Sequence, residues 1–257
     1  MTNTGKRAMN RAKKNKDITE AALVIIAEDG VASLTMHEVA DRVGCAVGTI
    51  YTYFSSKSSL LVALQADALE SLTESYSAAK KLWSKDLGKL DYGEATDRVV
   101  SLARVISMAR LFIEWPEIRA RDFALLQNFL ILQGSEIDPV DLEPILPSVL
   151  MFVFDISQLV EDAAESGAIV KSEDDPGDDT LARTLRWAGA LDGAVLIVGG
   201  ADPVESVNPE AFGLKQMATR LTTDFLSAWG ADASEIDLAL SAVGDLESAK
   251  TLFPVHS

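Results

Sequence analysis

The sequence predicts an all-α protein, with a small three-helix domain at the N-terminus followed by a larger helical bundle. Apolar side chains recur three, four and seven positions apart in every long segment, which is the period of an amphipathic helix. The strict alternation expected of strands is nearly absent. Of 257 residues, 48% are hydrophobic and 24% charged, so the chain has a globular composition and enough apolar surface for a core.

The first helix is predicted over residues 17–29, and Gly30 follows it as a natural C-cap. Its apolar stripe consists of Ile18, Ala22, Ile25 and Ile26. A second helix starts at residues 35–38, where the Thr-x-x-Glu pattern forms a capping box, and Gly44 ends it. A third, shorter helix over 47–54 turns Ile50 and Phe54 inward.

The remaining segments are longer and are separated by turn residues. Residues 55–57 break the pattern, and a long helix with Leu60, Leu61, Leu64, Leu69 and Leu72 is expected after them and before Asp91. The further helices expected are Glu94–Glu114, Pro116 to about Gln133, Val140–Ser166, Thr180–Val198, Pro209–Trp229 and a weaker amphipathic one (Ile236, Leu238, Leu240, Val243, Leu246) within 231–257. We expect four parts: 1–16 as a basic flexible arm, 17–65 as the N-terminal domain, 66–230 as the helical bundle, and 231–257 as a C-terminal helix and tail.

Charge is distributed unevenly along the chain. The formal net charge of −16 argues against a nucleic-acid binder when taken alone, because DNA repels an acidic protein. Residues 1–57, however, carry eight basic and six acidic side chains, whereas the other 200 residues carry 15 and 33. Six of the basic residues lie within the first 16 positions, where no acid occurs. This pattern indicates either an end that meets a polyanion or a solvated N-terminus.

Three features of the sequence bear on the cellular location of the protein. The polar, basic residues 1–16 precede no apolar stretch, so no signal peptide is expected. The most apolar runs are shorter than the roughly 20 residues of a membrane span. A single cysteine, Cys45, excludes an internal disulfide. We therefore expect a cytoplasmic protein.

Two short helices joined by a tight turn at residues 44–46, with a third helix before them, form a helix-turn-helix. Such a unit places its second helix in the DNA major groove. The short helix carries Thr49, Tyr51, Thr52 and Tyr53, whose hydroxyls and rings can contact phosphates, base edges and thymine methyl groups.

Residues 18–64 resemble the N-terminal domain of the TetR (tetracycline-repressor) family of transcriptional regulators. The resemblance rests on Ala21-Ala22, Gly30, Thr35, Val39-Ala40, Gly44, Gly48-Thr49-Ile50-Tyr51, Tyr53-Phe54, Lys57 and Leu60-Leu61. It implies a homodimeric regulator that binds double-stranded DNA and a small-molecule inducer of unknown identity, without a cofactor. The DNA-contacting residues that it implies are Thr35, Ala46, Val47, Gly48, Thr49, Tyr51, Tyr53 and Lys57.

This sequence departs from the family pattern at two positions. Cys45 stands where valine is usual, a mild change for a small packed side chain. Ala46 stands where a capping serine is common, so we expect the third helix to lack a side-chain N-cap, at a cost of about 1 kcal/mol. The third helix therefore offers few polar side chains that could hydrogen-bond base edges, which favours recognition through thymine methyl groups and DNA shape.

The aromatic residues of the middle helices are expected either to fill the bundle core or, in part, to line a ligand pocket. The candidate ligand-binding residues are Phe112, Trp115, Phe123, Gln127, Phe152, Asp155 and Trp187. The last two strongly apolar helices are expected to pair with their twofold mates as a four-helix bundle. The candidate dimer residues are Ala188, Ala190, Gly193, Leu214, Met217, Leu221 and Phe225.

We therefore predict a sequence-specific transcriptional regulator, a repressor that an inducer releases from a palindromic operator. The alternative is a ligand-independent DNA-binding structural or division-control protein on the same fold. No catalytic constellation or phosphate loop is present in the sequence, so we expect no enzyme activity. With two histidines and one cysteine, no metal site is expected.

Overall fold

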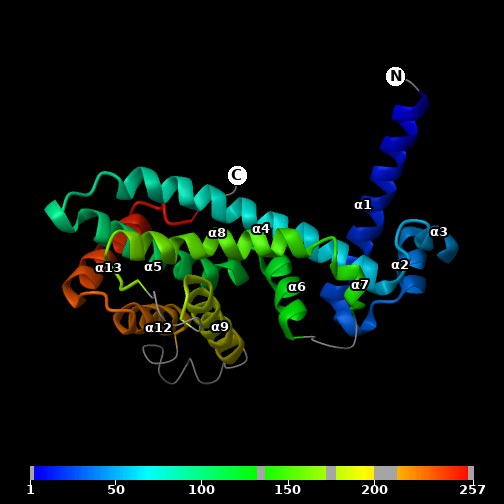
Figure 1. Ribbon diagram of the computed structural model, residues 1–257. Helices are drawn as coiled ribbons and strands as arrows, with labels where there is room; N and C mark the ends of the chain where they lie inside the picture. The colour runs from blue at the N-terminus through cyan, green and yellow to red at the C-terminus, as the bar shows by residue number, and fades with distance from the viewer. Residues whose placement is uncertain (1–2, 132–136, 172–177, 200–212, 254–257) are drawn as a thin grey trace. The chain divides into compact units, whose positions relative to one another are not determined.

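The computed structural model describes residues 3–131, 137–171, 178–199 and 213–253, and in these ranges every regular element is a helix (Figure 1). By its internal contacts the chain divides into two compact units. The first comprises Met1–Ser71 and Ala120–Val149, and the second comprises Leu72–Arg119 and Leu150–Ser257. The predicted all-α fold is confirmed, whereas the segment 120–149, expected in the bundle, groups with the N-terminal unit.

The first unit begins with α1 (Asn3–Asp29), α2 (Met36–Val43) and α3 (Val47–Tyr51), followed by the start of α4 (Lys57–Leu87). A 3-10 turn, η1 (Val31–Ser33), joins α1 to α2. α1 begins at Asn3, so residues 3–16, expected to be a basic flexible arm, are the first half of a continuous helix in the structure. Lys, Arg, Ala and Met favour helix, and the segment contains no proline to break it.

The core of the first unit is formed by the predicted apolar faces. Ile18 and Ile25 of α1, Val39 of α2 and Ile50 of α3 are fully buried in one cluster with the beginning of α4. Cys45 is partly buried against this cluster, as its packing interpretation predicted. Two further helices belong to this unit, α6 (Ala120–Ile131) and α7 (Pro139–Leu142), and Leu125 of α6 joins the cluster.

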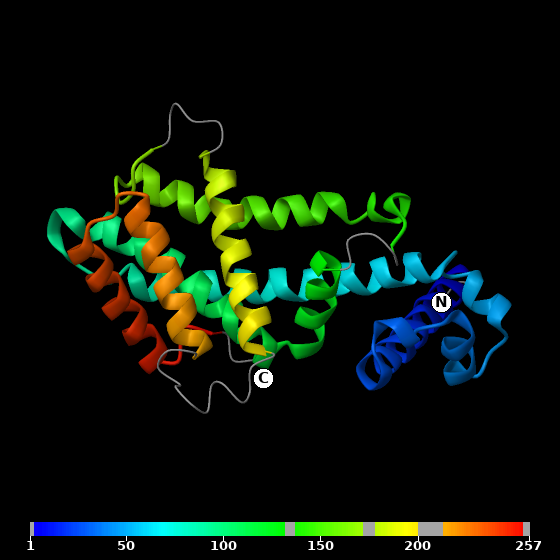
Figure 2. The same ribbon diagram turned by 90° about the horizontal axis from the view of Figure 1, so that it is seen from below.

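The second unit is built around α5 (Thr96–Ile118), which follows the short turn η2 (Gly93–Ala95). Nearly every side chain from Val99 to Ala109 is buried, which is the pattern of a helix covered on all sides. α12 (Leu214–Ala228) and α13 (Ala233–Ser248) pack against α5, and α9 (Thr180–Gly199) packs against α12 and α5 (Figure 2). The second half of α4 and α8 (Leu146–Glu165) complete the bundle.

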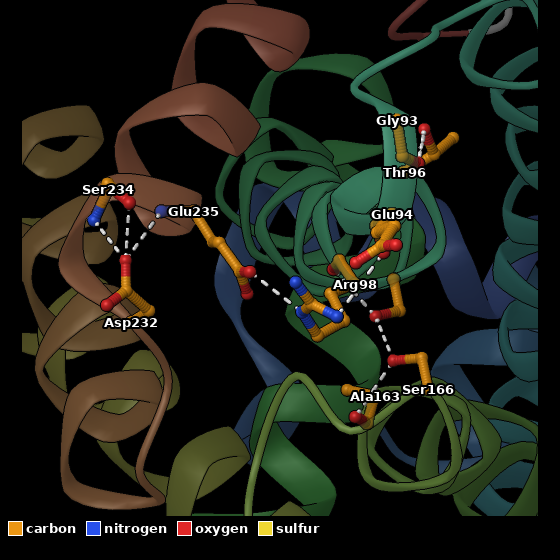
Figure 3. Close-up of polar contacts among 10 residues, drawn as sticks. Gly93, Glu94, Thr96, Arg98, Ala163, Ser166, Asp232, Ser234 and Glu235 are labelled. Carbon is orange, nitrogen blue, oxygen red and sulfur yellow. Dashed lines mark hydrogen bonds and ion pairs between the residues drawn. The ribbon is translucent and has the colours of Figure 1, made fainter.

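Polar contacts attach α13 and α8 to the start of α5 (Figure 3). Arg98 Nε donates to Glu235 Oε1 at 2.7 Å, and the hydroxyls of Ser101 and Ser166 lie 2.9 Å apart. Asp232 caps α13 by accepting hydrogen bonds from the backbone amides of Ser234 and Glu235.

The C-terminal segment after α13 returns to α4. Leu252 is 1% exposed, and its carbonyl accepts a hydrogen bond of 2.8 Å from the indole Nε1 of Trp83, which is fully buried. The predicted weak helix within 231–257 is therefore α13, held by a buried face. Leu238, predicted to be on that face, is 37% exposed, and Ala239 and Ala242 are buried there instead.

Prolines divide the helices differently from the prediction in two places. α5 continues through Pro116 and ends at Ile118, so this proline lies in its last turn and does not begin the next helix. The single helix predicted over Val140–Ser166 is two, α7 and α8, because the chain breaks around Pro144. The predicted starts of the loop at 172–179 and of the helix at 209–229 lie outside the described residues.

Candidate nucleic-acid interface

The turn of the helix-turn-helix is fixed by residues at both ends of α2. Thr35 Oγ1 accepts a hydrogen bond of 3.1 Å from the Glu38 amide, so the hydroxyl half of the predicted capping box is present. Gly44 ends α2 in the left-handed conformation, with φ of 68°. The amide of Cys45 then reaches back to the Ala40 carbonyl at 3.0 Å, and the chain turns directly into α3.

α3 is held by one face and presents the other. Ile50 is fully buried and Phe54, just past the helix, is 7% exposed, as predicted. Tyr51, on the opposite side, is 51% exposed. Ala46 makes no side-chain cap, which confirms the expected loss of the usual N-cap. The outward face of α3 is thus an accessible surface with little bulk beyond Tyr51.

The residues predicted to contact DNA lie on this surface with differing exposure. Thr35, Ala46, Gly48 and Tyr51 are exposed, whereas Val47, Thr49, Tyr53 and Lys57 are partly buried. Tyr53 differs most from the expectation, because its ring packs against the core cluster and does not point freely outward. The guanidinium of Arg11, from α1, lies 5.7 Å from the centre of this ring.

Ionic and hydrogen-bond contacts secure the elements around α3. Arg42 of α2 and Glu28 of α1 form an ion pair of 2.7 Å. Near the start of α4, the Ser58 hydroxyl accepts from the Asp138 amide at 2.8 Å, and Ser56 donates to Asp141 at 3.2 Å. These contacts link α7 and the residue before it to the end of the helix-turn-helix within the first unit.

The aromatic residues predicted for a ligand pocket form a connected group in the second unit. Phe152 of α8 lies between Tyr76 of α4 and Trp115 of α5, with ring centroids 6.2 and 6.1 Å away, and Phe112 meets Trp115 edge-on at 5.7 Å. Burial, reinforced by the charge of Asp155, raises the pKa of Tyr76 above its ordinary value.

Several buried polar atoms of the same unit lack a hydrogen-bond partner among the described residues. They are the hydroxyls of Ser75 and Ser107, Nε1 of Trp115 and Nε of Arg104. Buried polar groups in native proteins are nearly always paired with protein, water or ligand. Sequence reasoning missed the two serines, because a serine within a helix gives no pattern that separates a buried position from an exposed one.

The other predicted ligand residues are dispersed. Phe123 is buried on α6 in the first unit, and Trp187 donates from Nε1 to Thr222 of α12 at 3.0 Å. Asp155 forms an ion pair of 2.6 Å with Lys80. The side chain of Gln127 lies outside the described residues.

Two open grooves of the second unit involve different residues from those predicted. One, of about 730 Å³, is lined by Arg110 of α5, by α12 and by Leu240 of α13. Arg110 is tied there to Glu247 at 3.2 Å, and burial lowers the pKa of the guanidinium. The other, of about 720 Å³, lies between α4 and the segment around Phe253. In the described ranges no three His, Cys, Asp or Glu side chains are grouped as a metal site requires.

The predicted dimer helices pack on each other and leave apolar surface uncovered. Ala188, Ala190, Gly193, Leu214, Met217, Leu221 and Phe225 are all partly buried within the single chain. α9 also exposes Leu181, Leu185, Leu196 and Ile197, which are 44% to 67% exposed. A side chain added at Gly189 or Gly193 would meet nothing within 4 Å. None of the described helices combines the length and apolarity that a membrane span requires.

A capped, tightly turned pair of helices with an accessible second member defines the class: this is a helix-turn-helix DNA-binding fold. Residues 18–64 match the family of bacterial regulatory proteins, tetR family. The match covers the N-terminal helices of the first unit and not the rest of the chain. The resemblance inferred from the sequence is therefore confirmed.

Solved structures share the fold over most of the chain. A TetR-family regulatory protein from Rhodococcus RHA1 is 18% identical, with a TM-score of 0.57 over 86% of this chain and 98% of that one. RolR in complex with resorcinol is 20% identical, with a TM-score of 0.51 over 90% and 95%. A putative transcriptional regulator from Saccharomonospora viridis in complex with choline is 17% identical, with a TM-score of 0.52 over 84% and 96%. No curated protein matches the chain in sequence.

Proposed function

We propose that the protein is a homodimeric transcriptional repressor that binds a palindromic operator through α3 and leaves it when a small molecule binds the second unit. The observation that carries this proposal is the tight turn at Gly44, which follows the capped helix α2 and presents α3 with Gly48 and Tyr51 outward. A helix held in this way fits the major groove, and two copies read two half-sites one helical turn apart.

The ligand is proposed to bind near the aromatic group of Tyr76, Trp115 and Phe152. The unpaired hydroxyls of Ser75 and Ser107 and the indole N–H of Trp115 supply donors and acceptors in otherwise apolar surroundings. A few polar groups in an apolar lining are typical of small-molecule sites. The relatives whose structures contain resorcinol and choline support a small polar or aromatic molecule.

The coupling to DNA is proposed to run through α6 and α7, which belong to the same compact unit as α3. Asp122 of α6 accepts a hydrogen bond of 2.7 Å from Ser71 of α4. Asp141 and the Asp138 amide contact Ser56 and Ser58 at the beginning of α4. A ligand of the second unit that favours one conformation of the chain leading from α5 into α6 would therefore bias the helix that leads into the helix-turn-helix.

Dimerisation is proposed to occur through α9 and α12. α9 exposes four large apolar side chains, Leu181, Leu185, Leu196 and Ile197, and exposed apolar surface of this kind is typical of association surfaces. Gly189→Glu places a charge on this open face without a clash in the monomer, and it is expected to give a monomer in light scattering. Gly244→Glu, at a helical glycine of α13 where an added Cβ also meets nothing within 4 Å, is the control and should stay dimeric.

The repressor proposal is tested by selection from a randomised duplex library with the full-length protein. We expect an enriched palindrome that a Tyr51→Ala variant binds at least tenfold more weakly, and small aromatic compounds that release the wild type and quench Trp115 fluorescence. Failure to enrich any duplex would refute DNA recognition, whereas enrichment without release by any compound would refute induction.

A further inference from the structure

The N-terminal extension of α1, residues 3–16, is the strongest feature that the proposed function leaves unused. This segment is helical and is exposed from Gly5 to Lys13. It carries six of the 23 basic residues of a chain whose net charge is −16, and no acidic residue. A basic segment on an otherwise acidic protein indicates that this segment binds a polyanion.

The cations are ordered by the helix. Arg7, Arg11 and Lys14 are spaced by four and three positions, and Ile18 and Ile25 continue the same stripe. From Ile18 onward the stripe is fully buried in the core of the first unit. The three cations thus extend the face of α1 that holds the helix-turn-helix, past the point at which the core ends.

This stripe is physically joined to the end of the recognition helix. Arg11 lies over the ring of Tyr53, and a groove of about 410 Å³ runs between them. The groove is lined by Ala8, Arg11, Ala12, Asn15, Tyr53 and Phe54. The two alanines leave room for a backbone to approach, while the guanidinium and the amide supply hydrogen-bond donors for a phosphate oxygen.

Neighbouring charges do not neutralise the stripe. Lys16 pairs with Glu20 at 3.7 Å, but Arg7 and Lys14 have no acidic partner within the described residues. An arginine or lysine on a rigid helix neutralises a phosphate at a smaller entropic cost than the same residue on an unstructured arm.

We infer that the extension of α1 is a second DNA-contacting element, in which Arg7, Arg11 and Lys14 bind phosphates of the duplex that flanks each half-site. This inference rests on the proposed function. It lengthens the footprint of the protein on DNA beyond the base pairs read by α3, and it supplies affinity without sequence information.

The test compares DNA binding by the full-length wild type and by the triple variant Arg7→Gln/Arg11→Gln/Lys14→Gln. Each protein is measured on two forms of the selected operator, one trimmed to the palindrome and one with about ten extra base pairs on each side. Each lost phosphate contact lowers the slope of log K against log salt by about 0.9, so the slope on the long duplex should fall by about 2.7 per set of three contacts. Between 50 and 200 mM salt the wild-type affinity should then fall about 40-fold more than that of the variant for each protomer bound, or about 1,800-fold more for the dimer with its two sets. On the trimmed duplex the two proteins should agree.

A matched control removes the same charge from the acidic body: Lys81→Gln/Lys85→Gln/Lys171→Gln, three exposed lysines of the second unit, should keep the wild-type slope. Glutamine preserves helix propensity, and far-UV circular dichroism checks that α1 persists. An unchanged slope in the α1 variant would overturn the inference while leaving operator recognition intact. Failure of the wild type to select any duplex would instead refute the proposed function itself.

Two further outcomes would also count against the inference. Arg11→Lys keeps the charge, so it should keep the slope of log K against log salt. If Arg11→Lys and Arg11→Gln reduced this slope equally, the effect would be assigned to the packing of Arg11 on Tyr53. Retention of the wild type, but not the triple variant, on anionic phospholipid vesicles, with identical DNA binding by both, would assign the stripe to a membrane surface.

Discussion

Gly44 and Gly48 lie four residues apart in the helix-turn-helix, and replacing each by alanine should change stability in opposite directions. Gly44 adopts φ of 68°, where a Cβ atom costs about 1–2 kcal/mol. Alanine also stiffens the unfolded chain, which offsets about 0.4–1 kcal/mol of that strain. Since no atom lies within 4 Å of the added Cβ, no clash contributes, and the net loss should be about 1 kcal/mol.

Gly48 lies inside α3, and a Cβ atom there also meets nothing within 4 Å. Gly48→Ala should therefore stabilise the protein by about 0.5–1 kcal/mol, because alanine loses less entropy in a helix. If α3 approaches base edges closely at this position, the more stable variant should nevertheless bind the operator more weakly. Stability and DNA binding would then change independently of each other.

Urea unfolding measures the loss of stability in Gly44→Ala as a shift of the unfolding midpoint, with an unchanged dependence of the free energy of unfolding on urea concentration. Hydrogen exchange localises it: the amides of Gly44 and Cys45, which close the end of α2, should exchange about fivefold faster in Gly44→Ala. A Gly44→Ala protein as stable as the wild type would refute the left-handed cap. Unchanged operator affinity in Gly48→Ala would show that α3 keeps its distance from DNA there.

Three further results are expected. Thr35→Ala removes the N-cap of α2 and should cost about 1 kcal/mol in urea unfolding, while Thr35→Ser should restore it. Lys57→Ala should weaken DNA binding across sequences and reduce the slope of log K against log salt by about 1; an unchanged slope would remove Lys57 from the interface. Hydrogen bonds from the Ser234 hydroxyl and from the amides of Ser234 and Glu235 lower the pKa of Asp232 in the folded protein. The ionised carboxylate therefore stabilises the fold at pH values above the unfolded pKa near 3.8, and this stabilisation is lost as the pH falls through the lower pKa of the folded state. Asp232→Asn should flatten that acid dependence in thermal unfolding, and an identical pH profile for both proteins would contradict the cap.

Local signals made the N-terminal unit predictable. The Thr-x-x-Glu start of α2, the glycine at its end and the four-residue spacing of Ile50 and Phe54 each specify a conformation within a few residues. The surface that we propose to face DNA was assigned from the same pattern. Tyr53 departed from it: its ring packs against the core cluster and lies beside Arg11, more than forty positions earlier, and no local rule anticipates such a contact.

Features that depend on tertiary contacts could not be predicted from the sequence. The grouping of α6 and α7 with the DNA-binding unit depends on hydrogen bonds such as that between Ser71 and Asp122, whose partners are 51 positions apart. The aromatic side chains of the second unit were predicted as a set, but Trp187 is engaged by Thr222 and Phe123 belongs to the other unit. Periodicity indicates that an aromatic residue is buried; it does not specify which neighbours surround it.

The hydrogen bond from the Trp83 indole to the Leu252 carbonyl makes the fluorescence of Trp83 report whether the segment at Leu252 is docked on α4. Shortening the chain just before Leu252 would strand a buried donor and admit water beside the ring, which would move indole emission to longer wavelength.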